Sequence, residues 1–139
     1  MPVLTEDAVI DSLRASLVAD GWEIVSRARV SEHGADLIAT RGGTRLEVEA
    51  KGAGSSKPGT ARYGQMFNRA QVFVHVGEAL VKALRVASAG HARAAIALPD
   101  NRDHRSEIAL IRDALRRLGI IVFWVADDGT VSSEGFSDD

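Results

Sequence analysis

The sequence predicts an α/β fold in which helices flank a mixed sheet. Two short runs of alternating residues are separated by a Gly pair, which is typical of an antiparallel β-hairpin. Apolar residues then recur at helical spacing in three segments. Two later runs are short and continuously apolar, as expected of parallel strands covered on both faces. The sheet is therefore expected to combine antiparallel and parallel strands, joined by right-handed crossovers.

Local signals place each element in order. Thr5 is a suitable N-cap for the first helix, which ends before Gly21. A turn is expected at residues 41–44, where the Gly pair lies, and a Gly- and Ser-rich loop at residues 52–64. After the first helix the sequence predicts strands at 22–30, 36–40 and 45–51, a helix at 65–88, a strand at 94–98, a helix at 102–118 and a strand at 120–126. Residues 1–127 would form a single domain, and residues 128–139 a polar tail that is loose apart from a short segment at Thr130 and Val131.

Composition excludes several classes of protein. The chain has 139 residues, of which 45% are hydrophobic and 26% charged, as in one soluble globular domain. There is no cysteine, which excludes disulfides, Cys-ligated metals and a thiol nucleophile. No apolar run reaches the length of a membrane span and the N-terminus lacks a signal-peptide pattern, so we expect a cytoplasmic protein. The net charge of −2 means that any nucleic-acid site must be a local patch.

Three charged residues on the predicted hairpin form the candidate site. Asp36 opens the second strand, and Glu49 and Lys51 are two apart on the third, so they share a face. Pairing within the hairpin can bring Asp36 opposite them, within about 5.5 Å. Two carboxylates at that distance repel each other unless a cation lies between them, and Mg²⁺ or Mn²⁺ suits such oxygen ligands. Lys51 could then orient a water for hydrolysis of a phosphodiester, and Glu6 faces inward from the first helix.

A simpler interpretation stays open for this charged face. An acid two positions before one of the three lysines arises by chance in roughly 0.4 of chains of this composition, and polar strand faces are often only solvated. In that case Asp36 would affect neither metal affinity nor any activity.

The residues Glu6, Gly34-Ala35-Asp36 and Glu49-Ala50-Lys51, followed by a helix with Gln71, resemble the PD-(D/E)xK nuclease superfamily. The resemblance spans about residues 4–98. Within the superfamily, the spacing of Asp36 and Glu49 and the Glu-x-Lys triplet are similar to those of the Holliday-junction-resolvase-like branch. It implies a restriction-endonuclease-like fold. Ala35 stands where the family usually has Pro.

The resemblance also implies roles for individual residues. Asp36 and Glu49 would be metal ligands, with the Ala50 carbonyl as a third, and Lys51 would be the catalytic lysine. Glu6 would be the helix carboxylate. Gln71 would match a polar helix residue of some members, with Gln65 as the alternative. His75 lies on the same polar stripe as Gln71 and could face the substrate or the solvent.

A basic segment follows the candidate site. Lys57, Arg62 and Arg69 lie in a stretch without acidic residues, and such side chains could contact DNA phosphates. An ordinary exposed loop is the alternative. The Gly-rich run before Lys57 lacks the Gly that a P-loop needs, and Pro58 stands where Ser or Thr should be, so no nucleotide cofactor is expected.

Together these observations predict a Mg²⁺-dependent endonuclease that hydrolyses DNA. A homodimer is compatible with the helix at residues 65–88, which is apolar over most of its circumference. The alternative is a non-catalytic module of the same fold that binds nucleic acid or a protein.

Overall fold

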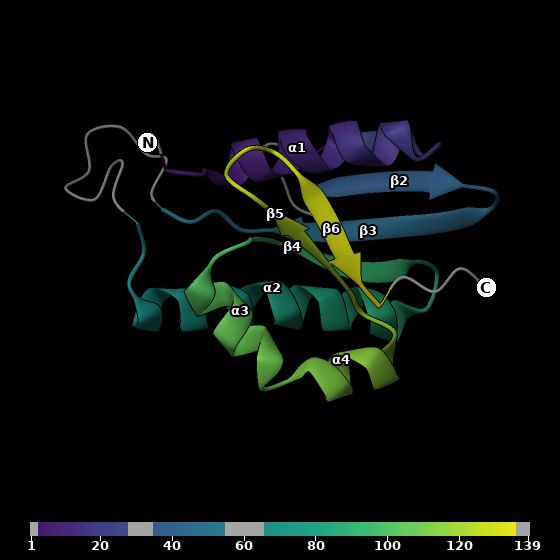
Figure 1. The fold of residues 1–139 in the computed structure, drawn as a ribbon. Helices are drawn as coiled ribbons and strands as arrows, with labels where there is room; N and C mark the ends of the chain where they lie inside the picture. Colours follow the sequence, from purple (N-terminus) through teal and green to yellow (C-terminus); the bar gives the residue numbers. More distant parts are fainter. Residues whose placement is uncertain (1–2, 28–34, 55–65, 136–139) are drawn as a thin grey trace.

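A six-stranded sheet runs through the molecule, with one helix on one face and three on the other (Figure 1). The computed structural model describes residues 3–27, 35–54 and 66–135. In chain order the elements are α1 (Glu6–Ala19), β1 (Glu23–Arg27), β2 (Leu37–Arg41), β3 (Thr44–Ala50), α2 (Arg69–Ala89), β4 (Arg93–Pro99), α3 (Arg102–Ala109), α4 (Arg112–Leu118), β5 (Ile121–Val125) and β6 (Val131–Glu134).

The strands lie side by side in sequence order, from β1 to β6. The pairs β1–β2, β2–β3 and β5–β6 are antiparallel, whereas β3–β4 and β4–β5 are parallel. The parallel pairs are those connected through helices, α2 in one case and α3 with α4 in the other. The predicted α/β fold with a mixed sheet between helices is confirmed, and it is compatible with a restriction-endonuclease-like architecture.

Each face of the sheet has its own apolar core. Leu46 and Val48 of β3 point to the face that α1 covers, where they pack with Leu13. Ile96 of β4 and Trp124 of β5 point to the opposite face of the sheet, which α2 and α3 cover. On that second face β3 presents Glu47, Glu49 and, just beyond its end, Lys51. The charged side of β3 therefore faces α2.

The hairpin turn and the start of α1 form where the sequence predicts them, whereas α2 begins at Arg69 rather than at residue 65. Gly42 and Gly43 join β2 to β3 with φ values of 55° and 84°, the left-handed conformation that a two-residue hairpin turn requires. The Thr5 hydroxyl accepts a hydrogen bond from the Ala8 N–H at the start of α1. Asn68 and Gln71 form a capping box at the start of α2.

The prediction of a single helix at residues 102–118 is wrong. It is divided into α3 and α4 at Leu110 and Ile111, and Figure 1 shows the two helices meeting at an angle. The Ile111 N–H bonds to the Ile108 carbonyl, which is a tighter turn than an α-helix makes. Neither Gly nor Pro marks the break, and apolar residues continue on the helical spacing across it. The pattern that predicted one helix therefore has no feature that separates two.

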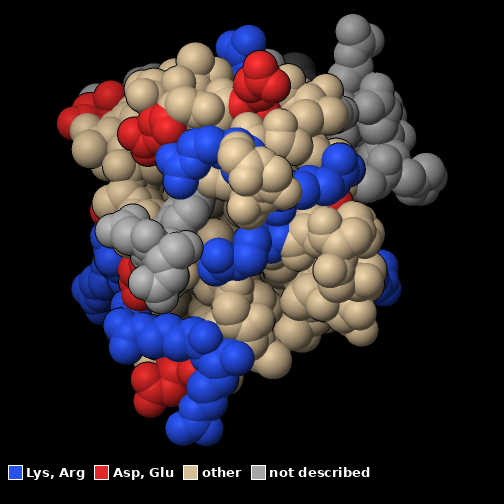
Figure 2. Space-filling view, turned by 90° about the vertical axis from the view of Figure 1, so that its right-hand side faces the viewer, with Lys and Arg blue, Asp and Glu red and all other residues tan. Residues whose placement is uncertain are grey.

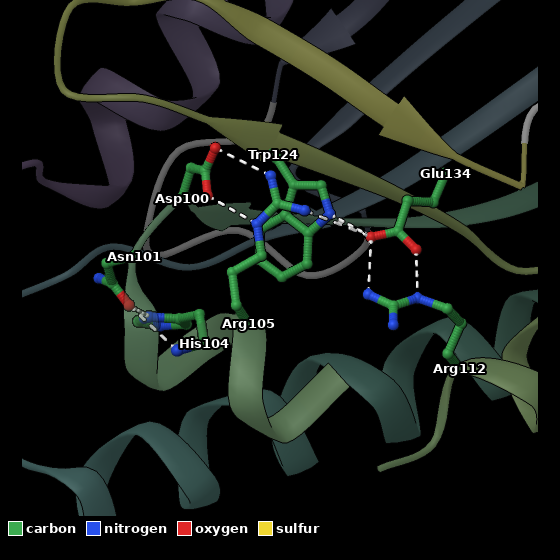
Figure 3. A network of polar contacts seen from close by, with 7 residues as sticks. All are labelled: Asp100, Asn101, His104, Arg105, Arg112, Trp124 and Glu134. Atoms are coloured by element: carbon green, nitrogen blue, oxygen red, sulfur yellow. Dashed lines mark hydrogen bonds and ion pairs between the residues drawn. The ribbon is translucent and has the colours of Figure 1, made fainter. Parts of the chain in front are cut away.

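The polar tail is also more ordered than predicted. Val131–Glu134 form β6, an edge strand held by its last side chain (Figure 3). The Glu134 carboxylate accepts hydrogen bonds from Arg112 Nε at 2.6 Å and from the indole N–H of Trp124 at 2.6 Å. Arg105 lies over the Trp124 ring, with its guanidinium carbon 4.2 Å from the ring centroid. Contacts of the polar Glu134 side chain thus help to hold this strand. The pattern of apolar residues in the sequence could not predict such contacts.

The predicted loop at residues 52–64 begins as packed structure. Gly52, Ala53 and Gly54 are buried, the Phe67 N–H bonds to the Ala53 carbonyl, and Gly54 bridges to Met66. None of the helices within the described ranges combines the length and apolar character of a membrane span.

Candidate metal centre

The β2–β3 hairpin brings Asp36 and Glu49 together. Leu37 pairs with Val48 in the antiparallel register, so one step further Asp36 lies opposite Glu49. Asp36 Oδ2 accepts a hydrogen bond of 2.8 Å from the Ala50 N–H, which anchors the carboxylate where β2 begins. The Asp36 carboxylate also acts on the Glu49 carboxyl group at close range and raises its pKa. Two acids thus share one small site at the ends of neighbouring strands.

The Glu49 carboxyl group is almost excluded from solvent, since the residue is only 4% exposed. Burial raises its pKa to about 7, and the negative charge of Asp36 adds to this shift. Lys82 and Lys51 oppose the shift because their positive charges favour the carboxylate form. Without a further cation, the Glu49 carboxyl group therefore holds a proton below about pH 7.

Glu6 belongs to the same electrostatic cluster, although it comes from the other face of the sheet. Gly52 packs so closely on the start of α1 that a Cβ atom there would clash with the Glu6 backbone nitrogen. The Ala53 N–H also donates to the Leu4 carbonyl at 2.7 Å. Burial and then the charge of Asp36 raise the pKa of Glu6, while Lys51 acts against them.

Helix α2 adds two charged groups that the sequence analysis did not assign to the site. Lys82 Nζ lies 3.8 Å from Glu49 Oε2, and Glu78 Oε2 lies 3.8 Å from Lys51 Nζ. Both residues belong to the single polar stripe of this helix, which faces the charged side of β3. That stripe was the signal available in the sequence. Its partner could not be inferred without knowing which face of β3 the helix covers.

His75 lies on the same stripe, one turn before Glu78. Burial and the positive charge of Lys51 lower the pKa of His75, which keeps the ring neutral at neutral pH. The ring meets Phe67 edge-on at 4.3 Å between centroids. His75 therefore lies near the site as a neutral, half-buried side chain.

Other residues predicted for the site have separate contacts or fall outside the described ranges. The Gln71 side-chain oxygen accepts from the Asn68 N–H as part of the helix cap. Arg69 pairs with Glu107 at 3.0 Å and with Asp103 at 3.9 Å, so acids of α3 surround its charge. Lys57, Arg62 and Gln65 lie outside the described residues. Roles for these five residues stay predictions.

The oxygen donors at this centre suit a hard divalent cation, but the protein supplies only a few of the ligands that such a cation needs. Asp36 and Glu49 offer carboxylate oxygens, and the Ala50 carbonyl points to the same edge of β3 as its N–H, which bonds to Asp36. Within residues 3–27, 35–54 and 66–135, no three Asp, Glu or His side chains are grouped closely enough to hold a metal by themselves. A bound ion would therefore need backbone and water ligands beside the acid pair, as Mg²⁺ commonly uses.

Exposed basic side chains gather at the other end of the molecule. Figure 2 views the hairpin-turn end, where Lys and Arg cover more of the surface than Asp and Glu do. β2 ends here with Arg41, α2 ends shortly after Arg85, and α4 ends with Arg116 and Arg117. Asp36 and Glu49 lie at the opposite end of the same hairpin, about 17 Å away along five residues of strand.

Comparisons with known proteins give distant similarity to solved structures. No protein-family model matches the chain, and no curated protein matches it. A solved structure of Pyrococcus furiosus SfsA in complex with Ca²⁺ is similar, with 17% sequence identity and a TM-score of 0.40. That similarity covers 94% of this chain and 59% of the SfsA chain. The chain thus spans about three-fifths of that neighbour.

Proposed function

We propose that this protein is a divalent-metal-dependent nuclease whose reaction centre is the Asp36–Glu49 pair. The observation that carries the proposal is the burial of the Glu49 carboxyl group opposite Asp36 on the paired strand, with Lys51 two residues further along the chain. A protein gains no stability from placing two acids together out of water unless a cation or a proton neutralises them. The strand register, which puts these two residues opposite each other, and the resemblance to PD-(D/E)xK nucleases both support the choice of this pair.

Asp36, Glu49 and the Ala50 carbonyl would hold the ion, which is Mg²⁺ or Mn²⁺. When bound at such a site, a divalent cation lowers the pKa of a coordinated water and neutralises charge on a phosphate. Asp36 keeps its orientation through the Ala50 N–H, so the pair is positioned before any ion arrives. Glu6 would act on the ion through a water molecule.

Lys51 would position the attacking water and screen the phosphoryl oxygens. Its side chain is 16% exposed and pairs with Glu78, itself 53% exposed, at 3.8 Å. The neighbouring N–H of Lys51 donates to the Ala97 carbonyl of β4, which fixes the backbone at the end of β3. The ammonium is therefore held at the rim of the acid pair, and Glu78 can release it toward a phosphate without leaving a buried charge.

DNA is the proposed substrate, cleaved within the strand, with Lys57, Arg62 and Arg69 as phosphate contacts. The alternative is a non-catalytic nucleic-acid or protein-binding module, which the basic surface remote from the acid pair favours. A cytoplasmic location stays a prediction. A homodimer also stays a prediction. It is favoured by the apolar side chains that α2 exposes, among them Phe73 and Val74.

Cleavage of plasmid and of short duplex DNA with Mg²⁺ or Mn²⁺ at pH 8 tests the proposal. We expect metal-dependent nicking that Asp36→Asn and Lys51→Ala abolish while their circular dichroism stays that of the wild type. Asp113→Asn, which changes an exposed acid of α4, is the control and should cleave normally. DNA binding without cleavage, equal in all four proteins, would favour the non-catalytic module.

A further inference from the structure

Lys82 reaches the acid pair from solvent. Its side chain is 50% exposed, whereas the Glu49 side chain that it approaches is 6% exposed. The ammonium and the Glu49 oxygen are 3.8 Å apart, which is an ion pair longer than a hydrogen bond. A lysine with a half-exposed, flexible stem can withdraw into water at little cost, while Glu49 cannot follow it.

The charges of the cluster define what should replace Lys82. Four carboxylates, those of Glu6, Asp36, Glu49 and Glu78, lie among the two ammonium groups of Lys51 and Lys82. With every group ionised, the cluster carries a charge of −2. Lys82 is therefore one of two tethered cations that only partly neutralise these acids, and a divalent ion would complete the neutralisation.

We propose that Lys82 is a built-in competitor of the metal ion: its ammonium occupies the acid pair when no ion is bound and leaves when one binds. This inference rests on the proposed function, because it concerns the same ion at Asp36 and Glu49. A bound cation and the Lys82 ammonium would repel each other, because both would draw on the Glu49 carboxylate. Metal affinity is then lowered by the strength of the ion pair that must first be broken.

Lys82 also explains how the negative charge of the acid pair is partly neutralised in the metal-free protein. Lys51 pairs with Glu78, so it is not fully available to Glu49. Lys82 supplies the positive charge nearest to Glu49 on α2. A competitor of this kind makes the site respond to metal concentration over a higher range than the two carboxylates alone would give.

Calorimetric titration of Mn²⁺ at pH 8 tests the inference without an activity readout. Lys82→Met keeps the apolar stem and removes the charge, and we expect it to bind Mn²⁺ about five- to tenfold more tightly than the wild type. Arg85→Met is the matched control, since it removes one positive charge from an exposed position three residues later on α2. It should leave affinity within about twofold, because exposed charges at longer range are screened.

A second readout follows the lysine itself. The chain has three lysines, so ¹³C-dimethylation gives few NMR signals and Lys82→Met assigns one of them. We expect the Lys82 signal to shift on Mg²⁺ addition with the midpoint of metal binding.

The two proposals fail in different ways. If the wild type binds Mn²⁺ and Lys82→Met binds it equally or more weakly, the competitor role is wrong while the metal centre stands. If neither protein binds Mn²⁺, the metal centre is wrong and the role of Lys82 falls with it.

Discussion

At Glu49 the protein keeps an acid almost out of water and beside a second acid. The pKa raised to about 7 means that the folded state holds a proton there that the unfolded chain releases near 4.5. Its stabilising contribution is therefore fully present below about pH 4.5 and is lost as the pH rises through 7. Above that pH the free protein carries a destabilising charge, which a bound cation would offset.

Replacing Glu49 should reveal this cost directly. Between pH 5 and pH 8 we expect the wild type to lose about 2 kcal/mol of unfolding free energy relative to Glu49→Gln, because the amide cannot ionise. Urea unfolding at the two pH values measures the difference. Glu47→Gln changes the neighbouring acid on the same face, which pairs with Arg45 at 3.0 Å, and should keep the wild-type pH dependence. A Glu49→Gln protein with the wild-type slope would contradict the raised pKa.

Sequence reasoning at the scale of residues succeeds where one element determines the answer. Asp36 and Glu49 follow from the hairpin, because the Gly pair sets the register that places them opposite each other. Glu78 and Lys82 depend on how α2 lies across β3, a contact between elements that periodicity does not define. The same limitation hides Gly52, which reads as the start of a loop in the sequence and packs against α1 in the structure.

The end of β3 and the start of α1 can pack closely because Gly52 has no side chain. Gly52→Ala would place its Cβ atom against the Glu6 backbone nitrogen, closer than Cβ atoms approach in real structures, so α1 or β3 must move. We expect a loss of about 2 kcal/mol or more in unfolding free energy, and weaker metal binding because Glu6 and Lys51 flank the contact. Gly77→Ala is the control, since nothing lies within 4 Å of its added Cβ on α2.

For that control, a helix gains roughly 0.5–1 kcal/mol when Gly is replaced by Ala. Opposite signs for the two substitutions are therefore predicted by thermal or urea unfolding. Equal stability of both variants would mean that the close approach at Gly52 is not present.

Edge strand β6 is held by polar contacts of Glu134 in addition to the packing of Val131 against the core. Glu134 joins it to Arg112 and Trp124, and Arg105 approaches the same carboxylate at 3.7 Å (Figure 3). Glu134→Gln removes the charge that holds two guanidinium groups, and we expect faster hydrogen exchange of the β5–β6 ladder by about tenfold. The β2–β3 ladder serves as the internal reference and should exchange at its wild-type rate. Unchanged exchange at β6 would contradict this account.

For the whole molecule, the order of elements and the mixed sheet follow from the sequence because each strand run is bounded by clear turn signals. The break between α3 and α4 and the pairing of β6 do not, since the first lacks a marker residue and the second depends on contacts of Glu134 with distant residues. The molecule places its acid pair at one end of the hairpin and an Arg-rich surface at the other (Figure 2).

The most direct measurement is the anomalous diffraction of crystals soaked in Mn²⁺ at pH 8. One Mn²⁺ peak is predicted between the carboxylates of Asp36 and Glu49, within ligand distance of the Ala50 carbonyl, with Lys82 turned away from Glu49. A map with no peak there, and with Lys82 still beside Glu49, would contradict the central claim.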